Sequence, residues 1–497
     1  MSDTVVLHPS DDVVVALHPL VAGASGEGIE VRSEIPAGHK FARRAIAVGE
    51  PVVKYGFPIG KATREIAPGE HVHTHNVSSG LDENLSYDSL QPAAAATGEP
   101  ARTARTFQGF RRPDGRAAIR NEIWIVNTVG CVNMVAQRMA QMATQRFAQT
   151  HPGVEGVYTF VHPFGCSQLG DDLTKTQDCL AGLINHPNAA GVLVLGLGCE
   201  NNQLRLQLEK AGVGESDRLR FFNTQEVGDE LEHGLGILDE LAAHAETMTR
   251  QPIPSSELIL AMKCGGSDGF SGITANPLLG ALSDRHCAAG GTAMLSEVPE
   301  MFGAEQVLLE RTDSQATFDE LAGMVNDFKD YFRRHEQPVF ENPSPGNKAG
   351  GITTLEEKSL GCVQKGGRAP VRQILGYGEA ATAGLGGLAL VNAPGNDGTS
   401  CTAMTAAGAH IVLFTTGRGT PLGVPAPTMK IATNSGLAER KPSWIDFDAG
   451  RLLTGTPMDT LADQIEDLVL EVASGKPVRN EVNGYREIAI WKTGVTV

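Results

Sequence analysis

The sequence predicts an α/β protein in which a small amino-terminal β unit precedes a large α/β region. Residues 1–90 contain short apolar runs broken by turns, whereas from residue 107 onward strand-like apolar runs alternate with stretches of helical spacing. Such alternation is typical of βαβ units in a largely parallel sheet. Several of the apolar runs are followed by glycine-bracketed polar strings. This is the pattern expected where parallel strands present side chains at the carboxyl edge of a sheet.

The amino-terminal unit spans residues 1–90 and has four runs with strand character, at 13–17, 28–32, 51–55 and 69–76. Glycine- and proline-containing turns separate these runs, which favours a small barrel-like β domain. Residues 91–106 are rich in alanine, threonine and proline and have no core pattern. We therefore expect a linker there.

The α/β region divides into residues 107–250 and residues 251–497. The expected strands of these two α/β domains lie at 123–126, 157–161, 191–195, 258–262, 387–391, 411–414 and 429–433, and a helix is expected near 459–474. A chain of 497 residues is too long for one ordinary hydrophobic core. Two or three domains are therefore expected.

Composition excludes several classes of function. The formal net charge of −17 argues against nucleic acid or an anionic membrane as partner, since both require a basic surface. No run approaches the roughly 20 apolar residues of a membrane span, and the first residues lack the basic and apolar regions of a signal peptide. The eight cysteines include no Cys-x-x-Cys pair. These features predict a cytoplasmic protein without a disulfide framework or a paired-cysteine zinc site.

Three histidines, His71, His73 and His75, recur at every second position. In a β-strand such residues face one side, so their imidazoles could converge on a divalent metal ion. The alternative is a polar strand face that carries histidines by chance. His39 lies in a Pro-Ala-Gly-His-Lys string and could be a turn residue, a base or a ligand.

Four cysteines, Cys131, Cys166, Cys199 and Cys264, lie within the glycine-bracketed strings. Free cysteine is often a small buried hydrophobic residue, so packing and a role in a site are both open for these four. Three cysteines around an iron–sulfur cluster with one open iron would also serve a dehydratase. A second set of residues, cations flanked by glycine turns, are candidate anion binders: Arg120, Lys348, Arg418 and Lys430.

Ten strings along the chain carry a resemblance. They are GEHVHTHN at 69–76, RNE at 120–122, TVGCVN at 128–133, GCSQLGDD at 165–172, LGCENNQ at 197–203, CGGSD at 264–268, TANP at 274–277, SEVPE at 296–300, PGNKAGGITTLE at 345–356 and TGRGTP at 416–421. As an ordered set that covers essentially the whole chain, they resemble the altronate/galactarate dehydratase family. Segments 297–305 and 444–450 are more similar to the altronate branch than to the galactarate branch.

The resemblance implies an amino-terminal SAF-type β domain and a large α/β catalytic region. It also implies iron(II)- or manganese(II)-dependent elimination of water from a sugar acid, D-altronate, to give 2-dehydro-3-deoxy-D-gluconate. A divalent ion would stabilise the enediolate formed when a base removes the weakly acidic C2 proton, and an acid would protonate the departing 3-hydroxyl. We expect the protein to be a homo-oligomer, specifically a dimer. The alternative to iron(II) or manganese(II) as cofactor is an iron–sulfur cluster.

On this basis we assign candidate roles to fourteen residues. Catalytic roles are expected for His39, Lys348 and Glu200; substrate binding for Arg120, Asn201, Ser267, Asp268, Asn347 and Arg418; and metal binding for His71, His73, His75, Cys131 and Cys166. The histidines belong to the β unit and the carboxylate binders to the α/β region. We therefore expect the active site between the two.

Two alternatives remain. A related lyase could remove water from galactarate or sulfite from sulfolactate. A carbohydrate-binding or scaffold protein built on the β unit would bind without turnover. The many polar loops that converge from separate parts of the chain favour an enzyme.

Overall fold

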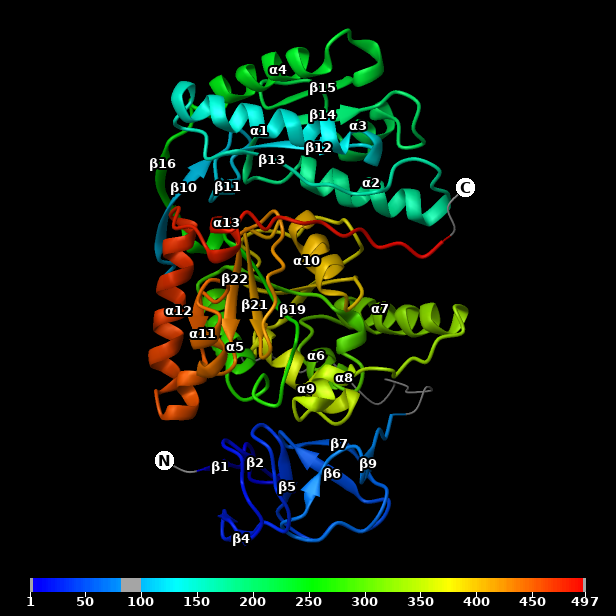
Figure 1. Ribbon diagram of the computed structural model, residues 1–497, viewed down its shortest axis with the longest axis vertical. Helices are drawn as coiled ribbons and strands as arrows, with labels where there is room; N and C mark the ends of the chain where they lie inside the picture. Colours follow the sequence, from blue (N-terminus) through cyan, green and yellow to red (C-terminus); the bar gives the residue numbers. More distant parts are fainter. Residues whose placement is uncertain (1–2, 82–99, 495–497) are drawn as a thin grey trace.

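The computed structural model describes residues 3–81 and 100–494, and Figure 1 shows three bodies stacked along the long axis. The amino-terminal β domain lies at one end, a region built on a seven-stranded sheet occupies the centre, and a smaller region built on a four-stranded sheet lies at the other end. The predicted class, a β domain followed by an α/β region, is confirmed. Residues 82–99, which include residues 91–99 of the predicted linker, lie outside the described residues.

The amino-terminal domain consists of short antiparallel strands. One sheet has the order β1-β2-β5-β8 and a second the order β6-β7-β9, while β3 and β4 form a two-stranded ribbon. The strands are β1 (Thr4–Val5), β2 (Val13–Ala16), β3 (Ser25–Gly26), β4 (Ile29–Glu30), β5 (Lys40–Ala42), β6 (Pro51–Lys54), β7 (Phe57–Ala62), β8 (His71–Val72) and β9 (Val77–Ser78).

The expected strand at 69–76 is wrong in its length. Strand β8 ends at Val72, and the backbone then turns, because the Asn76 side chain accepts a hydrogen bond from the His73 amide at 2.9 Å and the Asn76 amide donates to the His73 carbonyl at 3.0 Å. An asparagine that bonds to nearby backbone in this way competes with strand pairing. His73 and His75 therefore lie in a turn, and strand alternation does not place their side chains.

The second domain is a parallel four-stranded sheet of order β13-β12-β14-β15. Alternate side chains of β12 and β14 pack against α1 and α4 on one face and against α2 and α3 on the other, which gives two separate apolar clusters. The elements are β12 (Glu122–Asn127), α1 (Asn133–Thr150), β13 (Val157–Thr159), α2 (Gly170–Ile184), β14 (Ala189–Gly196), α3 (Leu204–Ala211), β15 (Leu219–Asn223) and α4 (Glu230–Ala245).

The central region is a parallel seven-stranded sheet of order β19-β20-β18-β17-β21-β22-β23. Its strands are β17 (Ile259–Cys264), β18 (Thr292–Leu295), β19 (Val371–Leu375), β20 (Gly387–Val391), β21 (Ile411–Thr416), β22 (Thr428–Ala432) and β23 (Phe447–Asp448). Helices α5 (Ala275–Ala288) and α12 (Met458–Ala473) share a core with one face, and α10 (Asp397–Ala406) packs on the other. The strands expected at 258–262, 387–391, 411–414 and 429–433 are confirmed.

The remaining elements of the central region gather beside the carboxyl edge of the sheet or connect the bodies. They are α6 (Glu305–Leu309), α7 (Gln315–Arg334), α8 (Pro345–Ala349), α9 (Leu355–Val363), α11 (Ser435–Arg440) and α13 (Arg479–Val482). An antiparallel ribbon of order β11-β10-β16, made of β10 (Thr106–Arg111), β11 (Ala117–Ala118) and β16 (Arg250–Pro254), lies between the two α/β regions.

Buried ion pairs join the bodies. Glu357 of α9 accepts hydrogen bonds from Lys40 at 2.8 Å and Lys54 at 2.7 Å, and all three side chains are fully buried between the β domain and the central region. At the other end, Arg486 of the carboxyl-terminal segment pairs with Glu122 of β12 at 2.9 Å. In the described part of the chain no helix is long and apolar enough to span a membrane.

Candidate active site

A pocket of about 530 Å³ opens at the carboxyl edge of the seven-stranded sheet. The turns after β17, β18, β20 and β21 form much of its wall, and α7, α8 and α9 close the remainder. Polar groups from these separate turns meet here because parallel strands end at the same edge. Residues that line it include Cys264, Ser267, Glu300, Asn347, Lys358, Asn396, Asp397 and Arg418.

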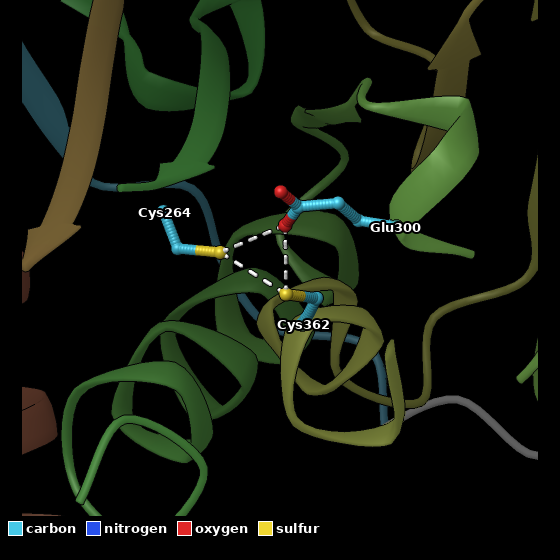
Figure 2. Close-up of side chains that lie close together, drawn as sticks. All are labelled: Cys264, Glu300 and Cys362. Carbon is cyan, nitrogen blue, oxygen red and sulfur yellow. Dashed lines mark hydrogen bonds between the residues drawn. The ribbon is translucent and has the colours of Figure 1, made fainter. Parts of the chain in front are cut away.

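Cys264 and Glu300 of the pocket wall converge with Cys362, as Figure 2 shows. Cys264 is the last residue of β17, Glu300 ends the short helical turn Val298–Glu300 after β18, and Cys362 lies in α9. The two sulfur atoms are 3.2 Å apart, and Glu300 Oε2 is 3.1 Å from Cys362 Sγ and 3.7 Å from Cys264 Sγ. Each of the three offers one ligand atom, so together they could hold a metal ion.

The electrostatics favour the charged forms of Cys264 and Glu300, whereas the hydrogen bond to Cys264 and burial raise the pKa of Cys362. The hydrogen bond from Cys362, together with the Lys365 ammonium 2.9 Å away, lowers the pKa of Cys264 to about 6. Burial opposes ionisation of Glu300, but Lys358, whose Nζ donates to Glu300 Oε1 at 2.8 Å, outweighs it and holds the pKa of Glu300 at about 2. A thiolate and a carboxylate are therefore available at neutral pH. Both are metal-ligand forms.

Three of the predicted substrate-binding residues, Ser267, Asn347 and Arg418, line this pocket. The Asn347 side chain donates to the Ser267 carbonyl at 2.9 Å, which fixes α8 against the turn after β17. The guanidinium of Arg418 is exposed and, within the described residues, donates one hydrogen bond, to the Gly346 carbonyl at 3.2 Å. Most of its donors thus remain available to an anion.

Asp268 lies beside the pocket rather than in its wall. Its carboxylate accepts hydrogen bonds from the Thr433 hydroxyl at 3.0 Å and the Asn434 amide at 3.2 Å, so it fixes the turn after β17 to the turn after β22. Burial raises the pKa of Asp268. The residue positions the wall that carries Ser267.

The histidines gather at the contact between the β domain and the central region. His39 Nδ1 is 3.1 Å from His71 Nε2, the ring centroids of His39 and His73 are 5.0 Å apart, and those of His71 and His75 are 5.3 Å apart. Burial and the neighbouring imidazoles lower the pKa of His71 to about 3. The four rings are thus close together, although a turn rather than a strand brings them there. Burial also lowers the pKa of His39 and of His73.

Helix α8 stands between the histidines and the pocket. His39 Nε2 lies 3.4 Å from the Ala349 carbonyl at the end of α8, and His73 Nδ1 lies 3.0 Å from the Thr353 hydroxyl just beyond it. Lys348 is on the same helix and is half-buried. Candidates from both halves of the chain therefore meet around one segment, residues 344–354, which has the pocket on one side and the imidazoles on the other.

Five candidates lie in the second domain or at its junction with the central region, away from the pocket. Arg120 is buried and pairs with Glu481 at 2.8 Å, and Glu200 accepts from the Thr128 hydroxyl at 2.6 Å. Asn201, Cys131 and Cys166 lie on loops at the carboxyl edge of the four-stranded sheet. The structure does not bring these residues to the pocket, nor the two cysteines to the histidines.

Sequence reasoning gave no role to Glu300, Cys362 or Lys358. Glu300 belongs to the SEVPE string, and its place just after a strand of the same parallel sheet as Cys264 was a usable signal. Cys362 had no such signal, because it lies within a helix and its neighbours in the sequence form no polar string.

Three family models match the chain in order: an altronate/galactarate dehydratase SAF domain at residues 2–80, a D-galactarate dehydratase/altronate hydrolase second domain at 109–246, and a D-galactarate/altronate dehydratase C-terminal domain at 255–496. The chain is 48% identical to an altronate dehydratase of Bacillus subtilis (strain 168), with both chains covered in full. It is 49% identical to an altronate dehydratase of Escherichia coli (strain K12), with 99% of each chain covered.

The chain belongs to the altronate/galactarate dehydratase family. A more distant member, the galactarate dehydratase (L-threo-forming) of Escherichia coli (strain K12), is 32% identical over 95% of this chain and 92% of its own. The family assignment made from the ten strings is confirmed. The β domain is a SAF domain, and the pocket lies in the C-terminal domain that the family shares.

Proposed function

We propose that the protein is an altronate dehydratase, a hydro-lyase that converts D-altronate to 2-dehydro-3-deoxy-D-gluconate and water. The observation that carries the proposal is full-length identity of 48% and 49% to two altronate dehydratases, against 32% to a galactarate dehydratase. The pocket supports it, because it combines an exposed guanidinium, amide and hydroxyl groups and a possible metal site within one cavity.

Substrate binding follows from the pocket wall. Arg418 has free donors for a carboxylate, and a guanidinium binds a carboxylate through two parallel hydrogen bonds. Asn347, Ser267 and Asn396 supply amide and hydroxyl groups that suit the hydroxyls of a polyol chain. Asp268 holds one of these walls in place.

The trio of Cys264, Glu300 and Cys362 is our candidate for the metal site. Two sulfur donors and one carboxylate suit iron(II) better than manganese(II), since manganese prefers oxygen donors. A divalent ion bound here would stabilise negative charge that develops on the substrate when the C2 proton leaves. Lys358 and Lys365, which contact Glu300 and Cys264, hold the ligand atoms in their charged forms.

Proton transfer requires groups beyond the trio. Asp397 is a pocket carboxylate that is 37% exposed and pairs with Lys263 at 2.9 Å, so it is our candidate base for the C2 proton.

His39 and Lys348 remain proposals as acid–base residues. Burial lowers the pKa of His39, so its imidazole is neutral at pH 7 and can accept a proton. Its position behind α8 requires that segment to move before the imidazole reaches the substrate.

The test is turnover on a panel of acids. Full-length protein, purified without oxygen and supplied with iron(II) or manganese(II), is incubated with D-altronate, galactarate and (2R)-sulfolactate, and 2-keto acid and sulfite are measured. We expect a 2-keto-3-deoxy acid from D-altronate. Preferential turnover of either other acid would assign the protein to a different activity, and binding without turnover would favour the non-enzymatic alternative.

We further propose that the protein works in the cytoplasm as a homo-oligomer. Support for the compartment is that all eight cysteines, each within the described residues, are free thiols.

A further inference from the structure

Three Gly-Cys pairs lie at the carboxyl edge of the four-stranded sheet, and we name them the Gly-Cys edge: residues 130–131, 165–166 and 198–199. They follow β12, β13 and β14, which are neighbours in the sheet. Cys131, Cys166 and Cys199 are the exposed cysteines of the chain, whereas the other five are buried. Because free cysteine is among the most buried residue types, three exposed thiols at one edge call for an explanation other than packing.

Backbone hydrogen bonds hold the three loops together. The Gly130 amide donates to the Phe164 carbonyl at 2.9 Å, which joins the first loop to the second. The Asn202 amide donates to the Gly165 carbonyl, also at 2.9 Å, which joins the third loop to the second. Neighbouring strands lie about 4.8 Å apart, so loops that continue them and bond to one another keep their cysteines within a small area.

The glycine before each cysteine allows this close approach. A Cβ at Gly130 would stand 2.7 Å from the His162 carbonyl oxygen, and one at Gly165 would stand 2.1 Å from the Thr128 carbonyl oxygen. Gly165 and Gly198 also have φ values of +100° and +127°, which side chains rarely permit. The local sequence is thus suited to bringing three cysteine-bearing turns together.

The same edge favours anions. Helices α2 and α3 each begin after one of these loops, and neither has a side chain that caps its first turn. Helix α4 of the same domain, by contrast, is capped by Asp229, which accepts from two backbone amides. Uncapped first-turn amides are free to donate to a negatively charged group, and thiolates and sulfides are such groups.

We propose that the Gly-Cys edge binds a [4Fe–4S] cluster through Cys131, Cys166 and Cys199, with a fourth iron that takes no cysteine from these loops. The distance between the sulfur atoms distinguishes an iron–sulfur cluster from a single metal ion. Tetrahedral thiolates on one ion, with metal–sulfur bonds of about 2.3 Å, stand about 3.8 Å apart. Among the described residues, the one group with three ligand atoms within 4.8 Å of one another is the trio in the C-terminal domain. The three cysteines of the Gly-Cys edge do not form such a group, as suits thiolates that each bind a different iron of a cluster.

The site is independent of the proposed function, and so is its test. Full-length protein is purified without oxygen, incubated with iron(II) and sulfide, and desalted, and iron and acid-labile sulfide are measured per chain together with the visible spectrum. We expect about four irons and four sulfides at this site and a broad visible absorption that dithionite bleaches. Cys131→Ser, Cys166→Ser and Cys199→Ser should each lower the sulfide content at least about tenfold.

Two control variants make the result specific. Cys179→Ala removes a fully buried thiol of the same domain, and Cys264→Ala removes a ligand of the C-terminal trio. Both should keep the acid-labile sulfide, while Cys264→Ala should lose iron without losing sulfide. Circular dichroism shows whether each serine variant is folded. Sulfide no higher than in the buffer, full sulfide in a folded serine variant, or a metal bound without sulfide at these cysteines would each overturn the proposal.

Discussion

Replacement of Glu357 by glutamine tests how the SAF domain is held on the C-terminal domain. Lys40, Lys54 and Glu357 are fully buried, and Glu357 is the shared partner of both lysines. The variant keeps the shape of the side chain and removes its charge. Two ammonium groups then remain at a buried interface without their anion, a situation that costs about 3–5 kcal/mol when one partner of a buried pair is removed.

The pKa of Glu357 gives a second measure of how much this buried ion pair contributes to stability. Burial raises the pKa of Glu357, but the two lysines outweigh it and lower the pKa from 4.5 to about 2. The difference of 2.5 pH units, at about 1.4 kcal/mol each, corresponds to about 3.5 kcal/mol of stability. Since the pKa of the folded state is the lower one, this contribution is fully present above pH 4.5 and is lost as the pH falls toward 2.

Hydrogen exchange of the full chain at pH 7 is the direct assay. Peptides that cover residues 40–54 and 353–360 should exchange about 300-fold faster in Glu357→Gln, the rate change that about 3.5 kcal/mol of local opening predicts. The matched control is Glu356→Gln. Glu356 is also buried and accepts from the Gly80 amide at 2.7 Å, a bond that glutamine can keep, and burial raises its pKa. Equal exchange in the two variants would refute the argument that charge pairing holds this interface.

Three further predictions concern the pocket and the histidines. Arg418→Met should lower kcat/KM for the sugar acid about 10- to 100-fold through loss of a charged hydrogen bond, while Arg451→Met, a half-buried control outside the pocket wall, should not change it. Cys362→Ala should lower bound iron(II), measured by elemental analysis, at least about tenfold, whereas Cys287→Ala, which removes a buried thiol outside the trio, should leave it unchanged. Because burial and neighbouring imidazoles lower the pKa of His71 to about 3, below its unfolded value of 6.5, stability should fall as the pH drops below 6.5, and His71→Gln should weaken that dependence in thermal unfolding.

Much of the architecture could be predicted from the sequence. Runs such as 258–262 and 411–414 are continuously apolar because both faces of a parallel strand are covered. The structure has strands β17 and β21 at these positions. The strand expected at 69–76 failed because Asn76 bonds to backbone three residues earlier, a local competition that alternation of residue types does not reveal.

The site was predictable only in part. Ser267, Asn347 and Arg418 were found because each lies in a glycine-bracketed string, and the structure places all three in one pocket. Cys362 was missed because tertiary packing of a helix brings it to Cys264 and Glu300, and its neighbours in the sequence do not indicate this contact. Deciding which of Cys131, Cys199 and Cys264 belongs to the pocket likewise needs the sheet topology, since similar glycine–cysteine turns end strands of two different sheets.

The reaction in D₂O tests the central claim most directly, namely that the C2 hydrogen leaves as a proton when water is eliminated. Product formed from D-altronate with iron(II) or manganese(II) under anaerobic conditions is examined by NMR. The account predicts a 2-keto-3-deoxy acid that carries one deuterium at C3, because the enol takes its new proton from solvent. A product without deuterium at C3 would show that the C2 hydrogen migrates instead, and absence of any 2-keto acid would contradict the proposed activity itself.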